Sequence, residues 1–397
     1  MSLIPNNLPT PSSVALAQSA QLAALIHDEI NSAGGWIDFS RFMHMALYTP
    51  QLGYYSGGSQ KIADLKKGGG DFVTAPEISP LFAQTLARQV AHVLQATHGD
   101  VLELGAGTGR LASDLLLSLN QAKALPQHYY ILEVSNHLRQ IQQETLQNSL
   151  PIELMQKVQW LESLPETFVG VVLGNEVLDA IPVHLVVNTT QGLHERGVTN
   201  QQDGFAWQDK AIANPKLLDY ASQHYANQHS LPPDYLTELC PAANGLIASL
   251  AGMLSHGAIL MIDYGFSAAE YYHPQRNQGT LMCHYQHFAH SDPLIYVGLQ
   301  DITAHVNFTA IAETALDNAL QVAGFTTQAQ FLVNCGITEL LNLVSPDDFV
   351  AYLPAVAAVQ KLVSPAEMGD FFKVIILTKN IDFPLVGFMQ GDKRHTL

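Results

Sequence analysis

Three alternating glycines and one acidic residue make up the stretch with the clearest chemical capacity. The segment reads Val101-Leu102-Glu103-Leu104-Gly105-Ala106-Gly107-Thr108-Gly109. Its apolar start predicts a short buried strand over 101–104, and residues 111–119 predict an amphipathic helix. Glycines between a strand and a helix let backbone N–H groups approach a ligand closely, because glycine has no Cβ. Glu103 near the turn favours a ligand with positive charge and would repel a pyrophosphate.

The glycine spacing distinguishes between kinds of nucleotide site. An acid followed by G-x-G-x-G resembles the first motif of the class I S-adenosylmethionine (SAM) methyltransferases. The third glycine falls one residue too early for the dinucleotide fingerprint G-x-G-x-x-G, which disfavours a nicotinamide dehydrogenase. Arg110 follows Gly109, and the sequence contains no Gly-Lys-Ser/Thr, so a Walker phosphate loop is excluded. A glycine-rich turn without a ligand is the alternative that this motif alone leaves open.

A second apolar strand, 129–133, ends in Glu133, which lies 24 residues after Gly109. That spacing fits a β-α-β unit whose second strand ends in a carboxylate for ribose hydroxyls. An ordinary solvated charge at a strand end is the alternative. Together with the glycine turn, Glu133 favours a cofactor of nucleoside type.

A third group of polar residues, Asn175, Glu176 and Asp179, follows the apolar strand predicted over 168–173. Ligands of doubly wound sheets bind beyond the carboxyl ends of the strands, so these residues should meet the ligand. A helical turn would place both acids on one face, because they are three residues apart. Acidic capping of a helix N-terminus is the alternative.

The elements that must position these residues follow the βαβα order of a parallel sheet. The predicted fold class is α/β, a Rossmann-like class I methyltransferase sheet with helices on both faces, an N-terminal helical cap and two insertions. Trp160, Leu161 and Glu162 end the third strand and form either an adenine-facing wall or part of the core. Further strands are expected at 257–263, 327–333 and 371–377, and helices at 14–33, 41–47, 80–96, 242–254, 311–323 and 351–362.

The chain divides into six predicted parts. Residues 1–80 form an N-terminal helical and lid segment, and 81–187 the first part of the cofactor-binding core. Residues 188–256 form an insertion with a small hairpin and a helix, and 257–264 a further core strand. Residues 265–310 form a loop-rich insertion on the substrate side, and 311–397 the C-terminal part of the core. The histidines of 265–310 are not paired with carboxylates at a recognisable ligand spacing, so no metal site is predicted.

Composition narrows the classes of partner. The 397 residues carry a formal net charge of −17, and clustered Lys and Arg are needed to bind phosphates, so nucleic acid is disfavoured as a partner. The acidity suits a cationic substrate, or it serves solubility alone. The three cysteines are far apart, which fits a reduced compartment without a disulfide framework. We expect a cytoplasmic protein that is not membrane-embedded, because no uninterrupted apolar run reaches about 18 residues.

Several blocks along the chain, taken together, are more specific than the glycine motif. They are Gly53-Tyr54-Tyr55, the stretch 70–79 (GDFVTAPEIS), the stretch 103–109, Leu132-Glu133-Val134-Ser135, the stretch 175–184 (NEVLDAIPVH), Asp263-Tyr264-Gly265, Arg276 with Gly279-Thr280, His284, and the stretch 301–308 (DITAHVNF). Over residues 20–380, they resemble the MidA-type class I methyltransferases, which include a mitochondrial complex I assembly factor that methylates arginine. The family often carries Pro where this chain has Ala106, and Asp where it has Asn307.

The resemblance implies SAM as cofactor and a protein substrate, with a respiratory complex I subunit as one candidate. It implies that Gly105, Gly107 and Gly109 wrap the methionine part of SAM and that Glu133 accepts hydrogen bonds from the ribose. Other cofactor contacts are expected from Glu103, Ala106, Val134, Leu161, Asn175 and Thr74. Lid or substrate contacts are expected from Asp71, Glu77, Tyr264, Arg276, His284 and His305.

For an arginine acceptor, carboxylates must grip the planar guanidinium and direct one nitrogen toward the methyl group. Glu176 is the first candidate for this role and Asp179 the second. Two alternatives stay open at this point, a small-molecule methyltransferase and a non-catalytic assembly factor that binds SAM. A nucleic-acid methyltransferase is disfavoured by the charge and by the lack of an Asn/Asp-Pro-Pro-Tyr/Phe sequence. Homodimer formation is a further open option.

Overall fold

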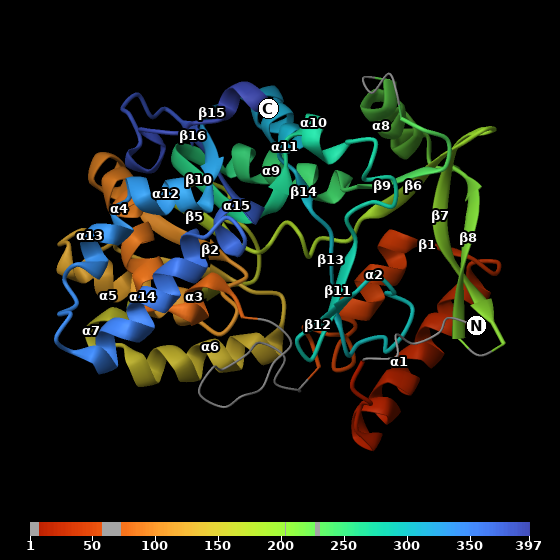
Figure 1. Ribbon diagram of the computed structural model, residues 1–397, viewed down its shortest axis with the longest axis horizontal. Coiled ribbons are helices and arrows are strands. Elements are labelled where there is room, and N and C mark those ends of the chain that lie inside the picture. The colour runs from red at the N-terminus through yellow and green to blue at the C-terminus, as the bar shows by residue number, and fades with distance from the viewer. Residues whose placement is uncertain (1–7, 58–72, 203, 227–230) are drawn as a thin grey trace.

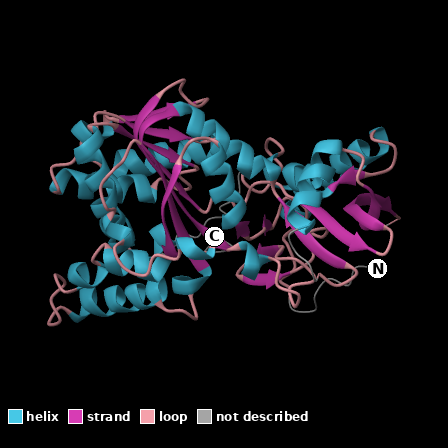
Figure 2. Ribbon diagram, turned by 90° about the horizontal axis from the view of Figure 1, so that it is seen from above, coloured by secondary structure: helices cyan, strands magenta, loops and turns pink. Residues whose placement is uncertain are grey.

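The computed structural model describes residues 8–57, 73–202, 204–226 and 231–397. The chain forms two lobes (Figure 1, Figure 2). The large lobe is built around an eight-stranded sheet, and the small lobe around a five-stranded sheet with the N-terminal helices. A three-stranded sheet lies between them.

The large sheet has the order β15-β16-β10-β5-β2-β3-β4, with β14 paired to β10. The pairs from β10 through β4 are parallel, and β16 runs antiparallel to both β10 and β15. This arrangement confirms the predicted α/β class. The strands are β2 (Asp100–Leu104), β3 (Tyr129–Leu132), β4 (Val158–Leu161), β5 (Phe168–Asn175), β10 (Leu254–Phe266), β14 (Val306–Asn307), β15 (Gln321–Thr327) and β16 (Phe372–Lys379).

Helices cover both faces of this sheet, as predicted, because its central strands are apolar on both sides. Along β10, Ala258, Leu260 and Ile262 belong to one hydrophobic core, whereas Ile259 and Met261 belong to the other. The first core packs under α4 (Pro80–Thr97), α5 (Arg110–Gln121), α6 (Asn136–Ser149), α7 (Ile152–Met155), α12 (Gln328–Asn334), α13 (Ile337–Leu341), α14 (Phe349–Val363) and α15 (Met368–Phe371). The second packs under α9 (Pro241–Met253) and α11 (Phe308–Asp317).

The small lobe joins the N-terminus to the first insertion. Its antiparallel sheet contains β1 (Ile37–Asp38), β6 (His184–Thr189), β7 (Gly192–Gln201), β8 (Gly204–Ala211) and β9 (Tyr235–Leu239). A separate hydrophobic core, which includes Leu22, Phe42 and Leu185, fixes α1 (Ser13–Ser32) and α2 (Phe39–Tyr48) to this sheet. α8 (Pro215–Ala226) packs near β7.

The second insertion is more regular than its sequence indicates. It contains α10 (Ala268–Tyr271), β11 (Met282–Tyr285), β12 (Phe288–His290) and β13 (Asp301–Thr303). β11 pairs antiparallel with both β12 and β13. Asp301 is the first residue of β13 and pairs with His284 of β11.

The predicted strand over 327–333 is wrong, because residues 328–333 belong to α12, and the strand lies earlier, at β15, which ends at Thr327. The predicted helix over 311–323 ends at Asp317 accordingly. The β15 pairing is irregular between Val322 and Gly324, which obscures the two-residue period in the sequence. Thr327 then caps α12 through the bond that its Oγ1 accepts from the Gln330 N–H.

In the described part of the chain, one stretch, Phe349–Phe371, is long and apolar enough to cross a membrane. Its mean hydropathy is 1.3, and 11% of its most apolar window is buried. Pro354 lies inside α14, and Gln360 and Lys361 interrupt the apolar run. Core helices and signal sequences also meet this length and composition criterion.

Candidate active site

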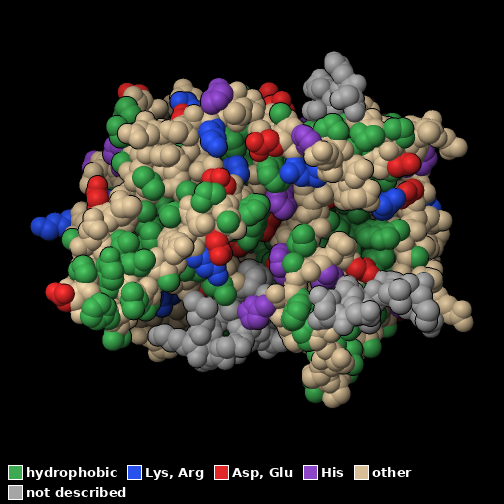
Figure 3. Space-filling model, in the orientation of Figure 1, with side chains coloured by type: hydrophobic (Ala, Val, Ile, Leu, Met, Phe, Trp, Pro, Cys, Tyr) green, Lys and Arg blue, Asp and Glu red, His purple; other side chains and the backbone are tan. Residues whose placement is uncertain are grey.

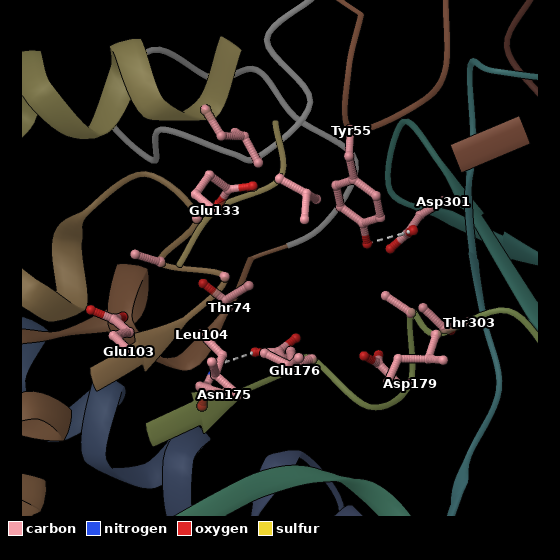
Figure 4. Close-up of a pocket in the computed structure, with 18 of the residues that line it drawn as sticks. Tyr55, Thr74, Glu103, Leu104, Glu133, Asn175, Glu176, Asp179, Asp301 and Thr303 are labelled. Atoms are coloured by element: carbon pink, nitrogen blue, oxygen red, sulfur yellow. Dashed lines mark hydrogen bonds between the residues drawn. The ribbon is translucent and has the colours of Figure 1, made fainter. Parts of the chain in front are cut away.

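A cavity of about 640 Å³ opens between the two lobes, at the carboxyl ends of β2, β3 and β5. Its size falls within the usual range for small-molecule sites. Histidine and acidic side chains gather along this seam on the face shown in Figure 3. Figure 4 shows Glu103, Glu133 and Thr74 on one side of the cavity and Tyr55, Asp301 and Asp179 on the other, with Glu176 between them beside Asn175.

The glycine turn lies between β2 and α5, as predicted. Gly105, Gly107 and Gly109 have φ values of 59°, 53° and 84°, in the left-handed region that residues other than glycine rarely adopt. Gly105, Ala106 and Gly107 line the cavity, whereas Gly109 lies behind it as the N-cap of α5. A Cβ on Gly109 would come within 3.2 Å of the Gln142 Cα, so this glycine also permits close packing against α6.

Glu103 is buried beside this turn and lines the cavity. Its Oε2 accepts a hydrogen bond of 2.6 Å from the Tyr129 hydroxyl. Burial raises the pKa of Glu103 to about 7, although the Tyr129 bond acts in the opposite direction. A cationic ligand group would therefore stabilise the ionised carboxylate.

Glu133 lies at the end of β3, where the sequence predicts a ribose contact. Its Oε1 accepts 2.9 Å from the Ser135 N–H, and its Oε2 accepts 2.9 Å from Gln142 Nε2. Trp160 donates from Nε1 to Gln142 Oε1 at 2.9 Å and so supports the same network from behind. Val134 is 80% exposed and lines the cavity, whereas Leu161 does not line it and accepts a hydrogen bond from Arg139 through its carbonyl.

The residues present fit the cofactor that the motifs imply. Asn175 lines the cavity, and its buried Oδ1 has no hydrogen-bond partner among the described residues, so it is an available acceptor for a ligand ammonium group. Glu103 offers a carboxylate to a cation, and Glu133 retains acceptor capacity for ribose hydroxyls. Thr74 and Glu77 also line the cavity, and the Thr108 hydroxyl donates to Glu77 Oε1, which joins α3 (Ala75–Ile78) to the glycine turn.

Glu176 lies directly after β5 with φ of 55°, a strained value for a non-glycine residue. Residues 176–179 are not helical, so the predicted helical turn is wrong, yet Glu176 and Asp179 both line the cavity. Asp263 shapes this turn, because its Oδ2 accepts from the N–H groups of Val177, Leu178 and Asp179 at 3.1, 2.8 and 3.4 Å. Asn175 Nδ2 donates 3.0 Å to Glu176 Oε1.

The carboxyl groups at this end of the cavity, and Asp263 beside it, have raised pKa values. Burial, followed by the charge of Asp263, raises the pKa of Glu176 to about 8. Burial and the charges of Asp263 and Glu176 hold the pKa of Asp179 well above its usual value. Burial raises the pKa of Asp263 to about 7, against the effect of four backbone N–H bonds. Such a cluster binds protons, or a cation, more readily than isolated carboxylates do.

The sequence did not single out four further residues that line this end of the cavity, Tyr48, Tyr55, Asp301 and Thr303. The Tyr55 hydroxyl donates 2.8 Å to Asp301 Oδ1, and the Tyr48 hydroxyl donates 2.9 Å to the carbonyl of Ala180. Tyr55, Asp301 and Thr303 lie within the blocks 53–55 and 301–308. The presence of a polar residue in such a block was the only available signal.

The remaining predicted substrate residues separate into three groups. Tyr264 and His284 line the cavity. Arg276 and His305 do not, because both pack on Phe266, with the Arg276 guanidinium 4.0 Å from the ring and the His305 ring stacked at 5.1 Å. Burial, with the nearby Arg276 charge, lowers the pKa of His305 to about 4. Asp71 lies outside the described residues.

Among the described residues, one group could hold a metal ion by composition, namely Asp38, His184 and Glu195. It lies outside the cavity. His184 Nδ1 is 2.7 Å from Glu195 Oε1, and Asp38 Oδ1 caps α2 by accepting from the Arg41 N–H. These contacts account for the group without a metal ion.

Comparison with known proteins agrees with this geometry. Residues 85–326 match the family model described as S-adenosyl-L-methionine-dependent methyltransferase. A COG1565 superfamily member from Burkholderia thailandensis, crystallised with S-adenosyl-homocysteine, is 49% identical, with a TM-score of 0.93 over 98% of this chain and 100% of that chain.

Two curated relatives carry the name protein arginine methyltransferase NDUFAF7, mitochondrial. The one from Danio rerio is 28% identical and covers 90% of this chain and 90% of its own length. The one from Homo sapiens is 27% identical, with 86% and 80% covered. With a glycine turn that lines the cavity and a family match over residues 85–326, this chain belongs to the S-adenosyl-L-methionine-dependent methyltransferases.

Proposed function

We propose that this methyltransferase transfers the methyl group to an arginine side chain of a protein. The observation that carries the proposal is a charge imbalance. Among the described residues, six carboxylates line the cavity, and Arg110 is the one Lys or Arg side chain that does so. Asp114 outside the cavity engages Arg110 at 2.7 Å, so that charge does not neutralise the cluster. The carboxylates are Glu77, Glu103, Glu133, Glu176, Asp179 and Asp301.

The cofactor end uses only part of this negative charge. SAM brings a sulfonium and an ammonium group against its own carboxylate, and Glu103 and Asn175 are placed to hold its cationic part. Glu176, Asp179 and Asp301 then remain at the other end. A guanidinium fits them, because it presents several N–H donors in a plane and carries a permanent positive charge.

The proposed chemistry gives each residue a defined task. Bound SAM supplies an activated methyl group, so the protein must position and desolvate the acceptor nitrogen. Glu176 and Asp179 orient the guanidinium through charge-assisted hydrogen bonds. Glu176, with a pKa of about 8, is suited to accept the proton that the acceptor nitrogen gives up.

The names of the curated relatives support the choice of arginine over other nucleophiles. We take a respiratory complex I subunit as the first acceptor to test, since the resemblance of the sequence blocks implies it. A cytoplasmic location and a homodimer stay predictions.

The test is transfer of labelled methyl from SAM to the proteins of an extract made from cells that lack this gene. Acid hydrolysis of the labelled protein fraction should release methylarginine. Label confined to small molecules would support a small-molecule methyltransferase instead. Binding of SAM without any transfer would support the non-catalytic assembly factor. Glu133→Ala serves as the control, because it should reduce all labelling through the cofactor site.

A further inference from the structure

Tyr55 lies where the small lobe meets the acceptor end of the cavity. Its hydroxyl donates 2.8 Å to Oδ1 of Asp301, which comes from β13 and is 2% exposed. In Figure 4 these two side chains point toward one another on the side of the cavity that holds Asp179 and Thr303. Burial and the Asp301 charge keep the Tyr55 pKa well above its usual value, so the hydroxyl keeps its proton and remains a donor.

The backbone of Tyr55 contacts the cofactor end. Its carbonyl accepts 2.7 Å from Ser135 Oγ. The N–H of Ser135 donates 2.9 Å to Glu133 Oε1, the carboxylate placed for the ribose. Tyr55 is therefore two hydrogen bonds from the ribose carboxylate and one from an acceptor-side carboxylate.

Packing restrains Tyr55 in this position. The Tyr48 ring stacks on it at 5.6 Å with an interplanar angle of 24°. The Tyr48 hydroxyl also donates to the carbonyl of Ala180, next to Asp179. A movement of Tyr55 would therefore displace both acceptor-side segments, the turn after β5 and the start of β13.

We propose that Tyr55 is a positioning residue that holds Asp301 as a third carboxylate for the guanidinium and couples the two halves of the cavity. A cofactor that binds Glu133 acts on Ser135 and Tyr55 through these hydrogen bonds, and this orients Asp301 for the acceptor. The acceptor then binds more tightly to the cofactor-loaded protein, and by linkage the acceptor tightens the cofactor by the same factor. This inference rests on the proposed arginine acceptor.

The experiment is calorimetric titration of the whole protein with N-acetylarginine methylamide, with and without saturating S-adenosyl-homocysteine. The wild type should bind this probe several-fold more tightly when S-adenosyl-homocysteine is present. Tyr55→Phe should weaken probe binding to the loaded protein by about tenfold and abolish the coupling, because Asp301 loses a charge-assisted hydrogen bond. Asp301→Asn should have a similar effect. The affinity for S-adenosyl-homocysteine alone should hardly change in either variant.

Tyr271→Phe is the matched control. Tyr271 is also buried, and its hydroxyl lies 3.4 Å from the Glu238 carboxylate, outside the main cavity. It should bind both ligands like the wild type. Wild-type coupling in both Tyr55→Phe and Asp301→Asn would overturn the role of Tyr55 and leave the arginine proposal intact. No probe binding by the loaded wild type would overturn the arginine proposal and this inference with it.

Discussion

The two ends of the cavity are assembled in different ways. At the cofactor end, Glu103 and its hydrogen-bond donor Tyr129 are 26 positions apart, on neighbouring strands of one β-α-β unit. At the acceptor end, the hydrogen bond from Tyr55 to Asp301 joins residues 246 positions apart, one from the N-terminal segment and one from β13. A continuous motif can therefore encode the cofactor end, whereas the acceptor end exists only after the N-terminal segment and the second insertion have folded against the core.

The two ends also differ in electrostatics. Glu133 is surrounded by donors, from the Ser135 N–H and Gln142 Nε2. Glu176 and Asp179 instead face other carboxylates, which raise their pKa values further. Hydrogen-bond donors therefore surround Glu133, whereas Glu176 and Asp179 lie close to other acids. If this contrast is correct, a single substitution should alter either the affinity for SAM or the reaction with the acceptor, but not both.

The largest effect is expected from Glu176→Gln. Turnover should fall by roughly 10²- to 10⁴-fold, because the amide neither holds the guanidinium charge nor accepts its proton. The affinity for SAM, measured by calorimetry, should stay close to that of the wild type. Glu144→Gln, on the exposed face of α6, is the control. If Glu176→Gln turned over at the wild-type rate, or lost SAM affinity in parallel with turnover, Glu176 would not serve the acceptor end specifically.

Glu133→Ala should show the reverse pattern. SAM binding should weaken by about 1–3 kcal/mol, because charged hydrogen bonds to the ribose are lost. At saturating SAM, the maximal turnover should largely recover. Calorimetry with SAM and steady-state kinetics at high SAM concentration measure the two quantities. Unchanged SAM affinity would show that Glu133 has no part in the cofactor site.

Asp263→Asn tests whether the turn after β5 serves the acceptor end specifically. Its carboxylate accepts from three consecutive N–H groups of that turn, and an amide oxygen is a weaker acceptor. The kcat/KM for the protein acceptor should drop by about tenfold with little change in SAM affinity. A drop in SAM affinity of similar size would mean that the turn supports both ends.

The pH dependence should separate the two ends as well. A cationic acceptor binds the ionised form of Glu176, whose pKa is about 8, so kcat/KM for the acceptor should rise about five- to eightfold between about pH 7 and 8.5. Glu103 has a pKa of about 7, so SAM affinity should rise as Glu103 ionises. This rise should level off at a lower pH than the rise in kcat/KM for the acceptor. Glu176→Gln should flatten the first profile and leave the second unchanged. Coincident profiles would contradict the assignment.

The smallest effect is on stability. The folded-state pKa of Glu176 lies above its ordinary value of 4.5, so the folded state binds more protons than the unfolded state between these two pH values. Stability therefore falls as pH rises through this window, and Glu176→Gln should remove that loss. The variant should have a Tm several degrees above the wild type at pH 8 and closer to it at pH 5. A lower Tm at pH 8 would show that the carboxylate stabilises the fold.

Prediction from the sequence succeeded where the signal was local. The glycine turn and the acids at the ends of β2 and β3 lie in the cavity as expected. Prediction failed where contacts between residues distant in the sequence decide the position of a side chain or the type of an element. Arg276 and His305 pack on Phe266 instead of the cavity, and residues 328–334 form a helix behind an irregular strand. Aromatic packing and a bulged pairing leave no periodic pattern in the sequence.

The sequence alone determined the parallel sheet, the glycine turn and the cofactor class, since strand periodicity, glycine spacing and strand-end acids act within a few tens of residues. Only the tertiary structure decided which carboxylates line the end of the cavity proposed for the acceptor. It brought Asp301 to Tyr55 and placed Asp263 under the strained turn at Glu176. The physical reason is that mutual burial and charge repulsion depend on distance in space, and residues from both lobes meet there only when the chain is folded.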